Sequence, residues 1–169
     1  MAKSKIPTKV LTELNRQFNH ELNAAHAYLG LSVWCEAQNL KGFAGFFAKQ
    51  AGEEREHAEK MMKHLLDRGA MPQLAATNSP KQDFGALLEV VEHAQAMEQT
   101  NTQGIHAVYE SAVAARDYPI QVLMHWFINE QVEEEAWAAE MVDRVQSATC
   151  AGSFMDLDRH IEKILAAGE

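Results

Sequence analysis

The sequence is short of cysteine, of basic residues and of long apolar runs, and each shortage excludes a class of protein. Two cysteines, Cys35 and Cys150, are too few for a disulfide scaffold. Lys and Arg total 15 against 24 Asp and Glu, and the net charge of -9 predicts cations rather than nucleic acid as partners. The sequence contains no run of about 18 apolar residues, and no apolar segment follows the N-terminal lysines. We therefore expect no membrane partner and a cytoplasmic location.

Proline and glycine are also scarce, with four and nine residues, so few positions can interrupt a helix. The apolar pattern predicts helices over about 7–38, 43–68, 83–116 and 119–146, with a short fifth over 154–167. The segment between Gly69 and Asp83 contains two prolines, and it is longer than most loops in compact domains. The pattern therefore predicts one all-α domain over 1–169, an up-down-down-up four-helix bundle with a long crossover loop.

Each of the four long helices places a glutamate on its core-facing stripe. The stripes follow alternating steps of three and four residues, and they contain Glu21, Glu54 with His57, Glu98, and Glu130 with Glu134. Counted from the turns at about 1.5 Å per residue, these side chains fall in neighbouring layers. Several ionised carboxylates in an apolar layer need protons or a cation, and carboxylates with one imidazole suit iron or manganese.

Taken singly, each of these acidic segments is better explained as a solvated face of a helix. The segment "EEREHAE" contains good helix formers that are normally exposed, and a stripe can be misassigned by one residue. The agreement in depth of glutamates from four helices is what favours a metal site over this simpler explanation.

Over essentially its whole length the chain resembles the bacterial non-haem ferritins. The resemblance is carried by "NHELNAAHAYLGLSVW", "GEEREH", the glutamate 19 residues before "DYP", and "NEQVEEE". It implies a ferritin-like fold and a ferroxidase centre, where Fe(II) is oxidised by dioxygen or peroxide before ferric mineral is stored in a hollow shell of 24 subunits. It also implies two irons per subunit, with Glu54 as the bridge, Gln131 as a hydrogen-bonding neighbour and Tyr28 as an electron-transfer residue. The implied ligands are Glu21, Glu54 and His57 for the first iron, and Glu54, Glu98 and Glu134 for the second.

The resemblance further implies a third, weaker iron site formed by Glu53, Glu130, Glu133 and Glu134. The chemistry of an oxygen-rich pocket agrees with this, because Glu53 points about 100° away from Glu54 around the helix and could face the fourth helix. The simpler alternative is that the additional acids, which include Glu56 and Glu59, coat an inner wall and attract ferric ions.

Some positions depart from related families. Glu130-x-x-Glu133 and Glu134-x-x-Trp137 lack the second histidine of bacterioferritins and rubrerythrins, and Arg55 stands near the place of the bacterioferritin haem ligand, so we expect no haem. Gln121 and Met124 occupy places where animal ferritins carry pore acids, which leaves the route of iron entry open.

Two alternatives and one expectation about assembly remain. The chain could be a di-iron redox or peroxide-reducing enzyme that stores no mineral, or a non-catalytic helical assembly protein whose acids are solvated.

The apolar face of the fifth helix suggests a further docking surface, which by resemblance lines the four-fold axes of a homo-oligomer. This face consists of Phe154, Leu157, Ile161 and Ile164.

Overall fold

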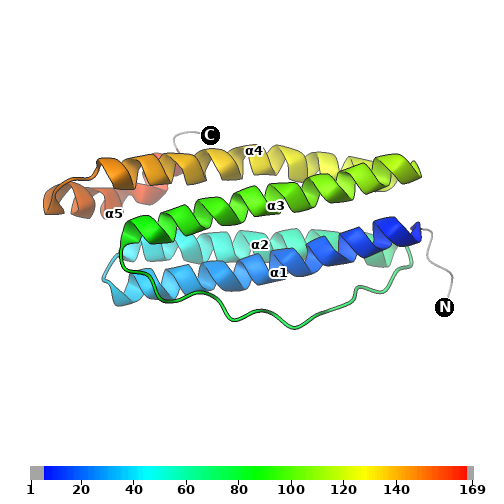
Figure 1. The fold of residues 1–169 in the computed structure, drawn as a ribbon, viewed down its shortest axis with the longest axis horizontal. Helices are drawn as coiled ribbons and strands as arrows, with labels where there is room; N and C mark the ends of the chain where they lie inside the picture. Colours follow the sequence, from blue (N-terminus) through cyan, green and yellow to red (C-terminus); the bar gives the residue numbers. More distant parts are fainter. Residues whose placement is uncertain (1–5, 167–169) are drawn as a thin grey trace.

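The computed structural model describes residues 6–166 and contains five helices and no strand within that range (Figure 1). The prediction of an all-α bundle of four long helices with a short fifth is confirmed. None of the described helices combines the length and the apolar character needed to cross a membrane. The helices are α1 (Thr8–Ala37), α2 (Lys41–Asp67), α3 (Leu87–Ala115), α4 (Tyr118–Ser147) and α5 (Ala151–Ala166).

A polar ladder on α1 holds the crossover loop, which runs the length of the bundle alongside that helix (Figure 1). Asn15, Asn19 and Asn23 recur every four residues and therefore lie on one face of α1. Their side-chain oxygens accept hydrogen bonds at 2.7–2.9 Å from the backbone N–H groups of Gln73, Ala75 and Asn78. The ladder satisfies backbone groups of a segment that has no secondary structure of its own.

The predicted start of the third helix at residue 83 is wrong, because α3 begins at Leu87. Phe84 is buried and packs edge-on against Trp34, at 5.9 Å between ring centroids, while Ala86 is extended. The backbone N–H of Gly85 donates to the side chain of Glu89 at 3.0 Å. An aromatic anchor and this local bond keep residues 83–86 out of the helix.

The start of α4 is fixed by Asp117, whose carboxylate accepts a hydrogen bond from the backbone N–H of Ile120. Arg68, directly after α2, binds the same carboxylate through two nitrogens at 2.8 and 3.0 Å. A bidentate pair of this kind has a defined geometry, so it ties the end of α2 to the turn between α3 and α4.

The core consists of two hydrophobic clusters with a polar layer between them. One cluster surrounds Tyr28, Phe47 and Val91, and the other surrounds Phe18 and Ile105. Along every long helix, buried polar residues separate the segments that enter the two clusters. These polar residues are Gln17, Glu21, Gln50, Glu54, His57, Glu98, Asn101, Gln131 and Glu134.

The fifth helix folds back onto its own bundle, so the expectation of an open docking surface is wrong for Leu157 and Ile161, which are buried in the first cluster. Asp158 accepts a hydrogen bond from the backbone N–H of Phe43 at 3.1 Å, and its carbonyl oxygen would lie 1.6 Å from a Cβ at Gly42. The glycine therefore permits close contact of α5 with α2. Phe154 is half-buried, and the side chain of Ile164 lies outside the described residues.

The fifth helix also begins three residues earlier than predicted, at Ala151. Ser153 lies within its first turn, and the hydroxyl donates to the carbonyl of Cys150 at 2.8 Å.

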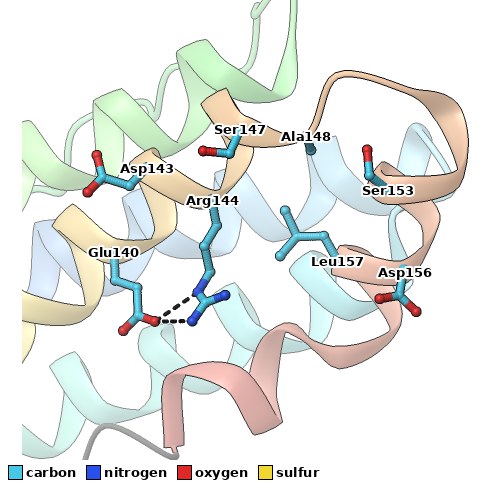
Figure 2. Close-up of a pocket in the computed structure, with 8 residues that line it drawn as sticks. All are labelled: Glu140, Asp143, Arg144, Ser147, Ala148, Ser153, Asp156 and Leu157. Carbon is cyan, nitrogen blue, oxygen red and sulfur yellow. Dashed lines mark hydrogen bonds and ion pairs between the residues drawn. The ribbon is translucent and has the colours of Figure 1, made fainter.

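A surface pocket lies between α4 and α5, where the chain folds back (Figure 2). Arg144 pairs with Glu140 at this pocket. None of the residues that line this pocket belongs to the buried polar layer.

Candidate metal centre

Three of the predicted ligands converge from α1 and α2 in the buried polar layer. Glu21, Glu54 and His57 each offer one ligand atom, and these atoms lie within 4.8 Å of one another. All three side chains are buried, with exposed fractions of 0 to 5%. The spacing of Glu54 and His57, three residues apart on α2, places both on the same face of that helix.

The helices α3 and α4 add Glu98 and Glu134, whose exposed fractions are 1% and 6%. A second group of ligand atoms within 4.8 Å of one another comes from His57, Glu130 and Glu134. Because His57 belongs to both groups, the two lie side by side. The layer therefore contains four buried carboxylates from four helices and one imidazole.

Burial and mutual repulsion raise the pKa values of these carboxyl groups. Burial, followed by the charge of Glu54, raises the pKa of Glu21 well above its ordinary value. Burial, followed by the charge of Glu98, does the same to the pKa of Glu54 and raises the pKa of Glu134 to about 7. Burial also raises the pKa of Glu98, although hydrogen bonds from Tyr28 and Gln131 oppose the shift. Without a cation, the site therefore retains protons near neutral pH.

Two of the carboxylates, those of Glu21 and Glu98, each accept hydrogen bonds from two side chains, and three of the four donors lie on another helix. Gln17 donates to Oε1 of Glu21 at 2.8 Å, and Asn101 donates to Oε2 at 3.2 Å. Glu98 accepts a hydrogen bond from the hydroxyl of Tyr28, and a second one from Gln131 at 3.2 Å. Each carboxylate is thus oriented by two side chains in the metal-free protein.

Glu134 has two donors as well, and both end on the same oxygen. Gln50 of α2 donates to Oε2 at 3.1 Å, and the indole N–H of Trp137 donates to the same atom. The opposing effects of these hydrogen bonds on the pKa are smaller than the effect of burial.

By contrast, Oε2 of Glu54 and Nδ1 of His57 are buried and have no hydrogen-bond partner within residues 6–166. The two atoms lie 3.4 Å apart. Buried polar atoms are nearly always partnered, and leaving one unpaired costs about 1–3 kcal/mol. A carboxylate oxygen and an imidazole nitrogen both coordinate iron, so these orphaned atoms fit a cation between Glu54 and His57.

The four residues expected to form a third site are placed unequally. Glu130 and Glu134 meet at His57, whereas Glu53 pairs with Lys49 at 3.2 Å and Glu133 is exposed. Neither Glu53 nor Glu133 belongs to the two groups of converging ligand atoms found among the described residues.

The buried seam of α4 differs by one residue from the predicted stripe over part of its length. The prediction put Glu130 on the core-facing stripe, but this residue is only partly buried. The buried positions are Met124, Gln131 and Ala138. The prediction for Glu130 is therefore wrong by one position along the seam, because steps of three and four residues can be taken in either order along a helix. Its carboxylate nevertheless meets His57 and Glu134.

Sequence reasoning missed Gln17, which is fully buried and holds Glu21. The available signal was its position four residues before Glu21 on the same helical face. A Cβ at Gly104 would lie 2.1 Å from the side-chain oxygen of Gln17, so this glycine leaves room for the amide. The roles of Gln50 and Trp137 were also missed.

The family model described as "Ferritin-like domain" matches residues 11–148, which include every residue of this centre. The chain belongs to the ferritin family. The bacterial non-heme ferritin of Staphylococcus aureus (strain MRSA252) is 41% identical over 127 residues, which cover 75% of this chain and 76% of that protein. The bacterial non-heme ferritin of Staphylococcus saprophyticus is 38% identical over 135 residues, covering 80% and 81%.

Solved structures of the same family agree with the fold. An open-pore ferritin from the archaeon Archaeoglobus fulgidus superposes with a TM-score of 0.89 at 31% identity, covering 92% of this chain and 95% of that one. A closed form engineered from the A. fulgidus ferritin gives a TM-score of 0.90 at 32% identity, covering 92% and 96%. Membership of the family thus rests on both sequence and architecture.

Proposed function

We propose that this chain is an iron-storage ferritin that oxidises Fe(II) with dioxygen or peroxide at the buried carboxylate layer. The observation that carries the proposal is the orphaned pair, Oε2 of Glu54 and Nδ1 of His57, enclosed by further carboxylates. Family membership supports the same conclusion. In this function Fe(II) is the substrate, and ferric mineral is the stored product.

The proposed first Fe(II) position is formed by Glu21, Glu54 and His57, whose ligand atoms already converge. The second is formed by Glu98 and Glu134, with Glu54 between the two. Two Fe(II) ions together supply two electrons, which reduce dioxygen to hydrogen peroxide or hydrogen peroxide to water. Holding both donors in one site allows the oxidant to receive the pair of electrons together.

Gln131 and Tyr28 have different parts in this proposal. Gln131 keeps Glu98 in place through its hydrogen bond to the carboxylate. The hydroxyl of Tyr28 contacts the same carboxylate, and its ring stacks on Phe47 at 6.0 Å between centroids. A buried phenol in contact with a ligand of the centre is suited to pass electrons, and we propose that Tyr28 is an electron-transfer residue beside the centre.

Proton release accompanies the proposed binding of Fe(II). The carboxyl groups retain protons because burial raises their pKa values, whereas coordination requires the ionised form. Binding should therefore strengthen as the pH rises toward and past about 7, the pKa of Glu134.

The third iron site remains part of the proposal. Glu130 and Glu134 supply two carboxylates beside His57, and Glu53 and Glu133 lie one residue before Glu54 and Glu134 in sequence. We propose that these four glutamates accept iron that leaves the pair, more weakly than the fully buried positions do. The absence of haem and a cytoplasmic location stay predictions from the sequence.

Storage also requires a shell, for which we propose 24 copies of the chain. Sedimentation of the native protein as a monomer or dimer at micromolar concentration would contradict this assembly. Aerobic additions of Fe(II) test storage itself, with the iron retained per chain after gel filtration as the readout. Retention of far more iron than the proposed sites can hold is expected, whereas retention of only the site-bound iron would favour the redox enzyme without mineral.

A further inference from the structure

We propose that Trp137 is a positioning residue that selects which oxygen of Glu134 faces the metal centre. The inference rests on the proposed function, because it concerns how a ligand of that centre is presented. It differs from the roles assigned to the predicted site residues, since an indole contributes no ligand atom.

The position of Trp137 follows from helical geometry. Trp137 lies three residues after Glu134, just as His57 lies three residues after Glu54, so each pair shares one face of its helix. The imidazole of His57 can coordinate a metal, but the indole N–H can only donate a hydrogen bond. The same helical position thus supplies a ligand on α2 and a donor on α4.

The hydrogen bonds at Glu134 give this donor a specific effect. The indole N–H of Trp137 and the amide of Gln50 both donate to Oε2 of Glu134. The two donors come from different helices, α4 and α2, and together they fix the plane of the carboxylate. With Oε2 doubly bonded in this way, Oε1 is the oxygen left for coordination.

The indole ring is itself held in place by aromatic contacts. It packs edge-on against Phe46 at 4.9 Å between ring centroids, and it lies 6.4 Å from the ring of Tyr28. Tyr28 in turn donates to Glu98. These contacts link the carboxylates of α3 and α4, and they prevent the indole from swinging away from Glu134.

The fixed orientation of the Glu134 carboxylate has a consequence for the second cation, which Glu98 and Glu134 are proposed to hold. One presented oxygen holds the second cation firmly, because both donors keep Oε2 occupied. Loss of the indole N–H should therefore weaken the second cation while leaving the first, held by Glu21, Glu54 and His57, unchanged. This split separates a positioning role from a general packing role.

The test is an anaerobic titration with Co(II), whose visible absorption reports each equivalent bound, on the wild-type protein and on Trp137→Phe. Phe keeps an aromatic ring and removes the N–H. We expect an unchanged first equivalent and a second equivalent weakened by about tenfold to a hundredfold, the usual effect of removing a donor to a metal ligand. Trp34→Phe, which alters an indole packed on Phe84 instead, is the matched control and should titrate like the wild type.

A second variant, Gln50→Leu, keeps the test independent of packing around the indole. Because both donors act on one oxygen, the effects of Gln50→Leu and Trp137→Phe on the second equivalent should not add in the double variant. A wild-type-like titration of Trp137→Phe would overturn the inference, as would equal weakening of both equivalents together with a lowered melting temperature. If the wild-type protein binds no Co(II), the proposed function fails and takes this inference with it.

Discussion

Two parts of the buried polar layer differ in how their ligating atoms are partnered. The carboxylates of Glu21, Glu98 and Glu134 each accept hydrogen bonds from two side chains. On α2, Oε2 of Glu54 and Nδ1 of His57 accept or donate none within the described residues. Three ligands are thus oriented in advance by the protein, while the remaining pair is left to be satisfied by a cation.

The difference indicates where binding energy is gained. Donors that orient a carboxylate reduce the reorganisation needed when a metal arrives. Unpaired buried atoms instead destabilise the metal-free protein, and coordination removes that cost. The centre therefore combines three carboxylates oriented by hydrogen bonds with one buried pair of atoms, on Glu54 and His57, that makes none. Changes to the two parts should have different effects.

The largest effect is expected from Glu54→Ala, which removes the proposed bridge and one of the orphaned atoms. The initial rate of aerobic Fe(II) oxidation, followed by the absorbance of ferric species, should fall by at least about a hundredfold because both cations lose a ligand. Glu56→Ala, an exposed acid on the same helix, is the control and should leave the rate unchanged. An unaltered initial rate in Glu54→Ala would refute the assignment of the centre.

A smaller effect is expected from Glu134→Gln on the stability of the metal-free protein. The pKa of Glu134 is raised from 4.5 to about 7, so the folded protein binds more protons than the unfolded chain between these values. The contribution to stability is therefore full below about pH 4.5 and is lost as the pH rises through 7. A neutral glutamine avoids the loss.

Urea unfolding in the presence of a chelator measures this effect. At pH 8 the Gln variant should be more stable than the parent by on the order of 3 kcal/mol, and the advantage should vanish toward pH 4.5. An advantage of equal size at both pH values would mean that packing, rather than ionisation, distinguishes the two proteins.

The orientation of Glu21 by hydrogen bonds is tested by Gly104→Ala. A new methyl group 2.1 Å from the side-chain oxygen of Gln17 must displace that amide from Glu21. The first equivalent of Co(II) should bind about tenfold more weakly, since one donor to its ligand is lost. Gly52→Ala, where nothing lies within 4 Å, is the matched control and should raise stability by up to about 1 kcal/mol without weakening binding. Equal Co(II) affinity in both variants would show that Gln17 does not position Glu21.

The smallest effect on the first oxidation is expected from Glu133→Ala. Glu133 is exposed and lies outside the converging groups, so the initial rate should be retained. The ratio of iron oxidised to oxygen consumed should change if the third site takes part. An unchanged ratio, together with unchanged iron density at that position in soaked crystals, would leave only the inner-wall explanation for this residue.

The fold and the burial of Glu21, Glu54 and Glu98 could be predicted because both follow from periodicity along single helices. Glu21, Glu54 and Glu98 occupy stripes that the 3.6-residue repeat defines, and depth follows from counting residues from the turns. The donors could not be predicted in this way. Spacing along the helix brings Gln17 near Glu21 and Trp137 near Glu134, but the rotamers that complete the hydrogen bonds depend on contacts with other helices, at Gly104 and Phe46.

The errors have similar causes. The start of α3 was misplaced because Phe84 is anchored by tertiary packing, which no local propensity reveals. The docking of Leu157 and Ile161 was misread because an amphipathic pattern does not say which surface covers the apolar face. In both cases the apolar residues are buried, as their pattern indicates, but the surface that covers them belongs to a distant part of the chain.

The most direct test of the two-part centre is a crystal soaked anaerobically with Fe(II) and measured at the iron absorption edge. Two strong anomalous peaks per chain are expected in the buried layer, one within coordinating distance of Glu21, Glu54 and His57 and the other of Glu54, Glu98 and Glu134. Peaks confined to exposed acids such as Glu56 and Glu59, with none between the four long helices, would contradict it.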